Sequence, residues 1–165
     1  MNRPILLGAV YFSTKASTLS ARIGYSLAPP PEFGKPFGEH SDLDLSVISP
    51  LLFERLVEAF RLFASDYRSG ALAPRNDHER MLWDANLEFA ERNIPRGFFD
   101  ASKVPNFERY LAAQRINQAM WALRKKLEAT AGAPTVRHAS TRVFRDWQCF
   151  IDRASLNLRW ALSAA

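Results

Sequence analysis

The alternation of apolar and polar positions changes period at Pro50. Upstream, residues 42–49 (DLDLSVIS) alternate between acidic and apolar side chains and then reach Val47 and Ile48, which predicts a β-strand. Downstream, from 50 to about 67, apolar residues recur at intervals of three and four, which predicts an amphipathic helix. Proline suits the first turn of a helix, so we expect the strand to lead directly into the helix.

The same spacing predicts three further helices. The first spans 76–93, with Asn76 or Asp77 as its N-cap. The second, at 107–130, is the longest and is ended by a glycine and a proline. The third spans 146–162 and presents apolar residues along one face.

The remaining segments have weaker signals. Residues 5–12 (ILLGAVYF) are compatible with a strand or a short helix, and residues 135–144 (TVRHASTRVF) with a strand or a hairpin. Prolines and glycines predict a long loop at 24–41, and 96–106 (RGFFDASKVPN) is also predicted to be a loop.

Together these elements predict a single α+β domain over residues 1–165. We expect a small mixed sheet that carries the Asp-x-Asp strand, flanked by helices, with a largely helical C-terminal half. Residues 1–50 would hold the motif-bearing sheet and loop, 51–133 would be helical, and 134–165 would add a strand and the final helix.

Composition narrows the class of protein. Hydrophobic residues make up 47% of the chain and charged residues 24%, which is typical of a soluble globular protein. No apolar run is long enough to span a bilayer, so no membrane partner is expected. The lone Cys149 excludes an internal disulfide, predicts a buried and inert thiol, and points to the cytoplasm. A net charge of +5 weakly favours polyanionic partners such as nucleotides or RNA.

Two carboxylates stand at the start of the predicted strand. Side chains alternate faces along a strand, so Asp42 and Asp44 would project to the same side. Two neighbouring carboxylates repel each other unless a cation lies between them, and Mg²⁺ often binds through one or two carboxylates together with substrate phosphates. The alternative is an acidic strand start that is merely solvated.

The stretch 41–45 (SDLDL) resembles the S-D-x-D-L signature of the polymerase-beta-type nucleotidyltransferase superfamily. Members of that superfamily carry a G-S-x-x-x-G pattern upstream. The best match here is 19–24 (LSARIG), in which Leu19 replaces the first glycine. The resemblance covers less than a fifth of the chain.

The resemblance implies a set of ligands and binding residues. Asp42 and Asp44 would be the catalytic carboxylates and would hold Mg²⁺ or Mn²⁺ with a nucleoside triphosphate, ATP being the expected one. Further residues would contact the phosphates, namely Ser20, Arg22, Gly24 and Ser41. The superfamily also uses a third carboxylate on a later strand, but residues 135–144 contain no acid. Asp146 is the only nearby candidate for this metal ligand, and its alternative role is a helix cap.

The function implied by this resemblance is the transfer of a nucleoside monophosphate to a hydroxyl on RNA, protein or a small molecule. RNA, including tRNA, or a partner protein would then be the binding partner. Small stand-alone bacterial members often serve in toxin–antitoxin or phage-defence systems, which suggests the same setting by analogy. The alternative is a catalytically degenerate member that acts as a nucleotide- or RNA-binding or regulatory interaction module.

Other residues admit both a functional and a structural interpretation. A basic group could follow a nucleic-acid backbone or form a solvated sheet face; its members are Arg137, His138, Arg142 and Arg145. All of the tryptophans fall in helical patterns, which predicts core packing; they are Trp83, Trp121, Trp147 and Trp160. Phe98 and Phe99 are expected to pack under their loop rather than stack on a base, and 75–78 (RNDH) is expected to be a loop and cap.

Overall fold

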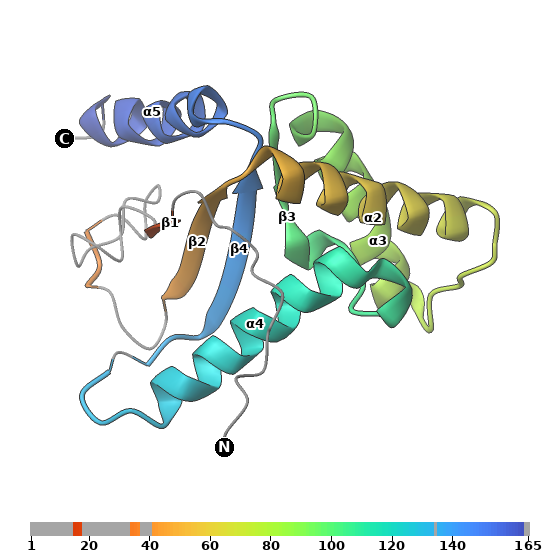
Figure 1. Cartoon of the computed structure of the whole chain (residues 1–165), viewed down its shortest axis with the longest axis horizontal. Coiled ribbons are helices and arrows are strands. Elements are labelled where there is room, and N and C mark those ends of the chain that lie inside the picture. The colour runs from red at the N-terminus through yellow and green to blue at the C-terminus, as the bar shows by residue number, and fades with distance from the viewer. Residues whose placement is uncertain (1–14, 18–33, 37–40, 134, 164–165) are drawn as a thin grey trace, which may run out of the picture.

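The structure is a computed structural model that describes residues 15–17, 34–36, 41–133 and 135–163, with side chains described at 34–36, 41–133 and 135–156. Its elements, labelled as in Figure 1, are β1 (Lys15–Ser17), β2 (Asp42–Ile48), α2 (Pro50–Arg68), α3 (Asp77–Asn93), β3 (Phe98–Asp100), the 3₁₀ turns η1 (Ala101–Lys103) and η2 (Glu108–Tyr110), α4 (Leu111–Glu128), β4 (His138–Phe144) and α5 (Trp147–Ser163). The predicted strand or helix at 5–12 lies outside the described residues.

The strands form one small mixed sheet in the order β1-β2-β4-β3. The two central strands, β2 and β4, run parallel, whereas β1 and β3 pair antiparallel at the two edges. Figure 1 shows α2, α3 and α4 to one side of the central strands and α5 beyond their carboxyl ends. The predicted α+β class, with helices around a small sheet that carries the Asp-x-Asp strand, is confirmed.

The strand-to-helix step at Pro50 follows the sequence pattern closely. Ser49 is the N-cap of α2, and its Oγ accepts a hydrogen bond from the backbone N–H of Leu52 at 3.3 Å. Pro50 occupies the first turn, where its missing N–H has no helical partner to lose. The predicted amphipathic helix is therefore confirmed, and its apolar stripe is buried, including Leu56 and Phe63 at 0% exposure.

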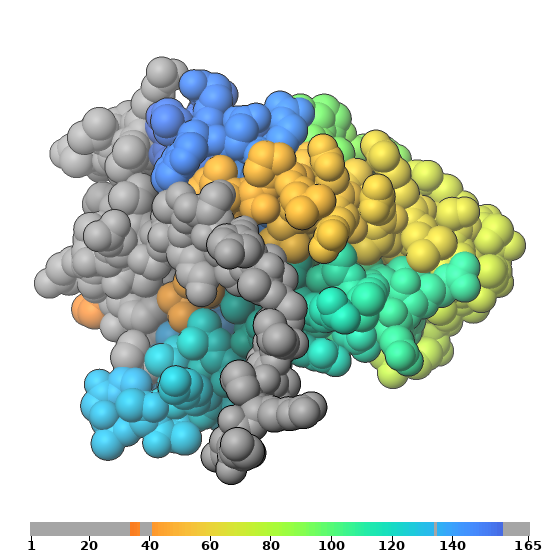
Figure 2. Space-filling model, in the orientation of Figure 1, coloured from red at the N-terminus to blue at the C-terminus, as the bar shows by residue number. Residues whose placement is uncertain are grey.

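The apolar stripe of α2 packs against one face of the sheet, called here the apolar face. Val47 from β2, Val143 from β4 and Phe99 from β3 lie on this face and belong to the same buried cluster as the stripe. Phe60 meets Phe99 edge-on with ring centroids 5.0 Å apart. Helix α4 covers the same face through Ala113, and Figure 2 shows the side chains of α2 and α4 in contact.

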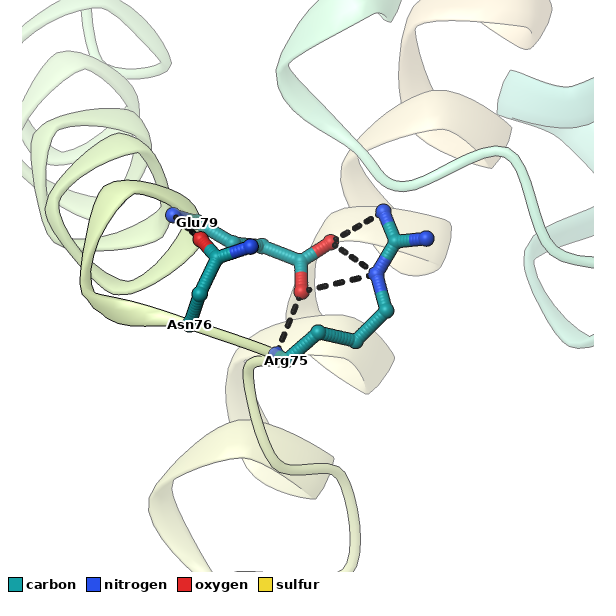
Figure 3. A network of polar contacts seen from close by, with 3 residues as sticks. All are labelled: Arg75, Asn76 and Glu79. Carbon is teal, nitrogen blue, oxygen red and sulfur yellow. Dashed lines mark hydrogen bonds and ion pairs between the residues drawn. The ribbon is translucent and has the colours of Figure 1, made fainter.

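The start of α3 is fixed by a capping network (Figure 3). Asn76 is the N-cap, and its Oδ1 accepts a hydrogen bond from the N–H of Glu79 at 2.9 Å. The Glu79 carboxylate in turn accepts from the backbone N–H of Arg75 at 2.6 Å and from its guanidinium. These bonds from Arg75 hold the pKa of Glu79 below its ordinary value. The expected loop and cap at 75–78 are confirmed.

A buried carboxylate joins α2 to η2, the 3₁₀ turn directly before α4. The carboxylate of Asp66 accepts hydrogen bonds from Nε and Nη2 of Arg109 at 2.6 and 2.9 Å, and from the hydroxyl of Tyr110 at 2.9 Å. Burial alone would raise the pKa of Asp66, but these hydrogen bonds outweigh it and hold the pKa below 3.8. Burial and the hydrogen bond to Asp66 raise the pKa of Tyr110 to about 12. This network is a structural junction between α2 and the turn that leads into α4.

The predicted loop at 96–106 is wrong in part, because it contains β3 and η1. Gly97 turns the chain into β3 with a φ of +76°, and its carbonyl accepts a hydrogen bond from the N–H of Arg145 at 2.8 Å. A side chain at Gly97 would collide with Cys149, which fixes glycine at this close approach. The predicted packing of Phe98 and Phe99 is confirmed, since both rings are buried.

The tryptophans divide between core and surface. Trp83 is buried beside Phe63, as predicted, but Trp121 and Trp147 are 61% and 48% exposed, so core packing is wrong for these two. The side chain of Trp160 lies outside the described residues. A helical pattern places a residue on a helix without saying that a neighbouring element covers it. Among the described helices, none combines the length and apolar character needed to cross a membrane.

Candidate functional site

The second face of the sheet, called here the polar face, carries the candidate chemistry. Side chains that are in register on neighbouring strands point to the same side. Asp42 and Asp44 are in register with His138 and Ser140 of the parallel strand β4. The polar members of this face that the structure describes are Asp42, Asp44, Ser46, His138, Ser140, Arg142 and Asp100. At the carboxyl ends of the strands the same face becomes apolar, because Ile48, Phe98 and Phe144 form a buried cluster there with Cys149 of α5.

Asp42 is held by a guanidinium. Its Oδ1 and Oδ2 accept hydrogen bonds from Nε and Nη2 of Arg137, at 3.0 and 2.8 Å. The side chains of Arg137 and Asp42 are 67% and 37% exposed, so water screens the pair. In this structure the positive partner of the acidic strand start is Arg137, which lies immediately before β4.

Asp44 is engaged by a hydroxyl rather than by a charge. Its Oδ1 accepts a short hydrogen bond from Oγ of Ser140, the residue in register with it on β4. No hydrogen bond from a described residue reaches its Oδ2. One oxygen of Asp44 is thus oriented by Ser140, while the other has no competing protein donor among the described residues.

A third carboxylate of the polar face, Asp100, was not anticipated from the sequence. Its Oδ1 accepts hydrogen bonds from the N–H and Oγ of Ser102 at 3.0 and 2.7 Å, and its Oδ2 lies 3.9 Å from Nη2 of Arg142. Strand β4 separates Asp100 from Asp44, and the two residues differ by two positions in register. Strand spacing and rise place their Cα atoms about 12 Å apart, too far for one metal ion to share. In the sequence, the one indication that Asp100 lies in ordered structure is the pair of aromatic residues, Phe98 and Phe99, directly before it.

Asp146 is placed at the far end of β4. Its Oδ1 accepts a hydrogen bond from the N–H of Cys149 at 2.8 Å, as expected of a helix cap, and its Oδ2 accepts one from Nε of Arg145 at 3.1 Å. The bonds from Cys149 and then from Arg145 lower the pKa of Asp146 to about 2. Asp146 follows the carboxyl end of β4, whereas Asp42 pairs with the amino end, so the structure does not bring these acids together.

The expected phosphate contacts are only partly described. Ser20, Arg22 and Gly24 lie outside the described residues. Ser41 lies directly before Asp42, and its carbonyl accepts a hydrogen bond from the backbone N–H of Arg137 at 3.0 Å. Within the part of the chain that the structure describes, no group of three or more His, Cys, Asp or Glu side chains is arranged to hold a metal ion. Among the described residues, Asp42 and Asp44 are the pair that could hold a metal ion together with oxygen atoms of a substrate.

A cavity of about 300 Å³ opens beside the amino end of β4. Its wall includes Ser102, Asn106, Asn117, Trp121, Arg124 and His138. β3 pairs only with residues 142–144 of β4, so the cavity lies along the part of β4 that β3 does not reach. Its volume is at the lower end of the range of about 300–1,000 Å³ for small-molecule sites. His138 belongs both to this wall and to the polar face, where it is in register with Asp42.

The basic group of the sequence does not form one continuous stripe. Arg137 pairs with Asp42, Arg145 pairs with Asp146, and His138 lines the cavity. Arg142 lies farther along the polar face, near Asp100. These residues thus have separate local neighbours among the described residues, and both interpretations of the group, a nucleic-acid track or a solvated sheet face, stay predictions.

Comparison with known proteins identifies no relative. The chain matches no protein-family model, no curated protein and no solved structure. The likeness at 41–45 is therefore a likeness of a short motif, and any function must be argued from the side chains of the polar face.

Proposed function

We propose that this chain is a metal-dependent nucleotidyltransferase that moves a nucleoside monophosphate from a nucleoside triphosphate, with ATP as the expected donor. The observation that supports this most is the placement of Asp42 and Asp44 on one face of a parallel central strand. Asp42 is exposed, and Asp44 keeps Oδ2 without a protein donor among the described residues. Two carboxylates with substrate phosphate oxygens match the usual ligand set of Mg²⁺.

The carboxylate pair is compatible with a divalent cation. Asp42 already binds the guanidinium of Arg137, which suits a site that attracts positive charge. An exposed ion pair of this kind contributes only about 0–1 kcal/mol, so a divalent ion can compete with it. When bound, such an ion neutralises charge on the entering and leaving oxygens of a phosphoryl transfer. Ser140 would keep Asp44 oriented through Oδ1 while Oδ2 faces the cation.

The acceptor is proposed to be a hydroxyl on RNA, including tRNA, on a partner protein or on a small molecule. The cavity beside His138 supports a bound nucleoside or a similar planar group, because it combines Trp121 with side-chain amides and Arg124. A cytoplasmic role in a toxin–antitoxin or phage-defence system is part of the same proposal and rests on analogy with small nucleotidyltransferases.

A second candidate function is that of a nucleotide- or RNA-binding or regulatory module without turnover. Arg137 and Ser140 already satisfy three of the four carboxylate oxygens of the pair. In addition, no third carboxylate is placed beside them among the described residues. In this alternative the acids bind Arg137 for structural reasons and the polar face recognises a ligand without reacting with it.

Nucleotidyl transfer separates the two candidates. The purified chain is incubated with Mg²⁺ or Mn²⁺, each α-labelled nucleoside triphosphate, and either bulk tRNA or cell lysate. The test variant is Asp42→Asn with Asp44→Asn, which keeps side-chain shape and removes charge. Asp152→Asn is the matched control, because Asp152 is an exposed acid on α5.

The proposal expects label on an acceptor with the wild type and with Asp152→Asn, and loss of label with the double variant. Nucleotide binding that depends on Asp42 and Asp44 without any labelled acceptor would favour the second candidate. Equal labelling by the double variant would contradict the assignment of both acids.

A further inference from the structure

Two arginines from different elements lie against Phe98, beside the carboxyl end of β4. Arg142 extends from β4 and Arg153 from α5, with their Cζ atoms 5.9 and 5.3 Å from the centre of the Phe98 ring. Both distances are within the range of a cation–π contact. Arg96 lies in the turn before β3, and its charge acts on Arg153. Burial lowers the pKa of Arg153, and the charges of Arg142 and Arg96 lower it further.

This cluster has too few negative partners. The one ion pair between these arginines and a described acid is with Asp100, whose Oδ2 is 3.9 Å from Arg142 while its Oδ1 already accepts two hydrogen bonds from Ser102. The Nε atoms of Arg142 and Arg153 are buried and have no hydrogen-bond partner. Buried donors without partners cost stability, and like charges held together repel. The described acids thus balance only part of the positive charge gathered here.

Other arginines of the chain show what a structural arginine looks like here. Arg109 makes two hydrogen bonds to Asp66, and Arg137 makes two to Asp42. In both cases the Nε and Nη2 edge of the guanidinium donates to the two oxygens of one carboxylate. Arg142 and Arg153 differ, because their Nε donors are desolvated and unfilled next to an aromatic ring.

We infer that Arg142 and Arg153 form a binding site for a phosphoryl anion carrying two or more negative charges, such as a diphosphate group. Guanidinium forks match phosphate oxygens in charge and in geometry, and Phe98 holds two of them in place from one side. Arg142 is two residues beyond Ser140 on the same face, so the site adjoins Asp44 without including it. The inference stands on the arginines alone and does not require the proposed transferase activity.

Inorganic pyrophosphate without metal is the direct probe, measured by isothermal titration calorimetry on the full chain at low ionic strength. Arg142→Gln and Arg153→Gln should each weaken binding about tenfold or more, since each removes charged hydrogen bonds to the anion. Arg115→Gln is the matched control: Arg115 is exposed on α4, and its replacement changes net charge equally. The double variant Asp42→Asn with Asp44→Asn should bind pyrophosphate as tightly as the wild type, which separates this site from the proposed active site.

A parallel titration with ADP distinguishes the source of the phosphates. Tighter binding of ADP than of pyrophosphate would identify a nucleotide, and equal binding would identify an inorganic polyphosphate. Thermal unfolding without pyrophosphate provides the stability readout: Arg153→Gln should keep or raise Tm, because it removes a positive charge held beside Arg142 and a buried Nε donor without a partner among the described residues. Undiminished pyrophosphate binding by both arginine variants, an equal loss with Arg115→Gln, or a lower Tm for Arg153→Gln without pyrophosphate would each overturn the inference.

Discussion

The two faces of the central sheet are built from alternate residues of the same strands and differ in how their side chains are satisfied. On the apolar face, Val47, Val143 and Phe99 are at most 4% exposed and pack against helices. On the polar face, Asp42 is partly exposed and Arg142 has an unfilled donor. The first face is packed almost throughout, although the buried hydroxyl of Thr141 on it has no hydrogen-bond partner among the described residues. The second face has charges that a ligand would complete, and only its carboxyl end, at Ile48, Phe98 and Phe144, is packed as a core.

The largest loss of stability is expected when a buried side chain of the apolar face is removed. Phe99→Ala removes a fully buried ring that contacts Phe60, so we expect a loss of about 3–5 kcal/mol in the free energy of unfolding. Urea denaturation followed by circular dichroism measures this loss. Phe107→Ala is the control, because Phe107 is 44% exposed. Similar losses in the two variants would contradict the assignment of the core to this face.

A smaller, pH-dependent loss of stability is expected at the junction of α2 with η2, directly before α4. Asp66→Asn weakens the contacts with Arg109 and Tyr110 and should lower the urea midpoint at neutral pH. The pKa of Asp66 in the folded chain is below its ordinary value of 3.8, so its contribution is present above that pH and is lost as pH falls further. The wild type should therefore be no more stable to urea than Asp66→Asn once the pH falls well below about 4. A constant difference from pH 7 to pH 2 would contradict this origin.

A smaller loss of stability is expected from a substitution at the N-cap of α2, where β2 leads into the helix. Ser49→Ala removes the side-chain acceptor for the N–H of Leu52, which should cost about 1 kcal/mol in the free energy of unfolding. Ser49→Asp, which keeps a capping oxygen, should recover most of that loss. Urea denaturation of the three proteins checks this, and an Asp variant as unstable as the Ala variant would argue against a capping role.

The smallest stability effect is expected on the polar face. Arg137→Gln removes an exposed ion pair, so the free energy of unfolding should change by less than about 1 kcal/mol. The same change should tighten Mn²⁺ binding, because it removes the cation that competes for Asp42. Mn²⁺ titration monitored by electron paramagnetic resonance tests this, and weaker binding would show that Arg137 supports the site instead.

Local patterns were sufficient to predict much of this architecture. The strand at 42–48 and the helix that follows could be read directly, because one period changes to another at Pro50 and Ser49 supplies a cap. The start of α3 was predictable for the same reason, since Asn76 is a strong N-cap. Strand β3 was not, because three residues between turns are too short to show a period.

The partners of the site could not be predicted. Arg137 and Asp42 are 95 positions apart, and only the parallel register of β2 with β4 brings them together. Asp100 was missed for the same reason, because its place on the polar face depends on a short edge strand. The acidic pair itself was visible, since its spacing alone fixes a shared face.

The central claim is that the polar face binds a metal–nucleotide pair through Asp42 and Asp44. The most direct test is Mn²⁺ binding, with and without a non-hydrolysable ATP analogue, followed by electron paramagnetic resonance in the wild type, Asp42→Asn/Asp44→Asn and Asp152→Asn. We expect the analogue to tighten Mn²⁺ binding in the wild type and in Asp152→Asn, and the double variant to lose about tenfold or more in affinity. Mn²⁺ binding that is unchanged in the double variant, or absent from the wild type with the analogue present, would contradict the account.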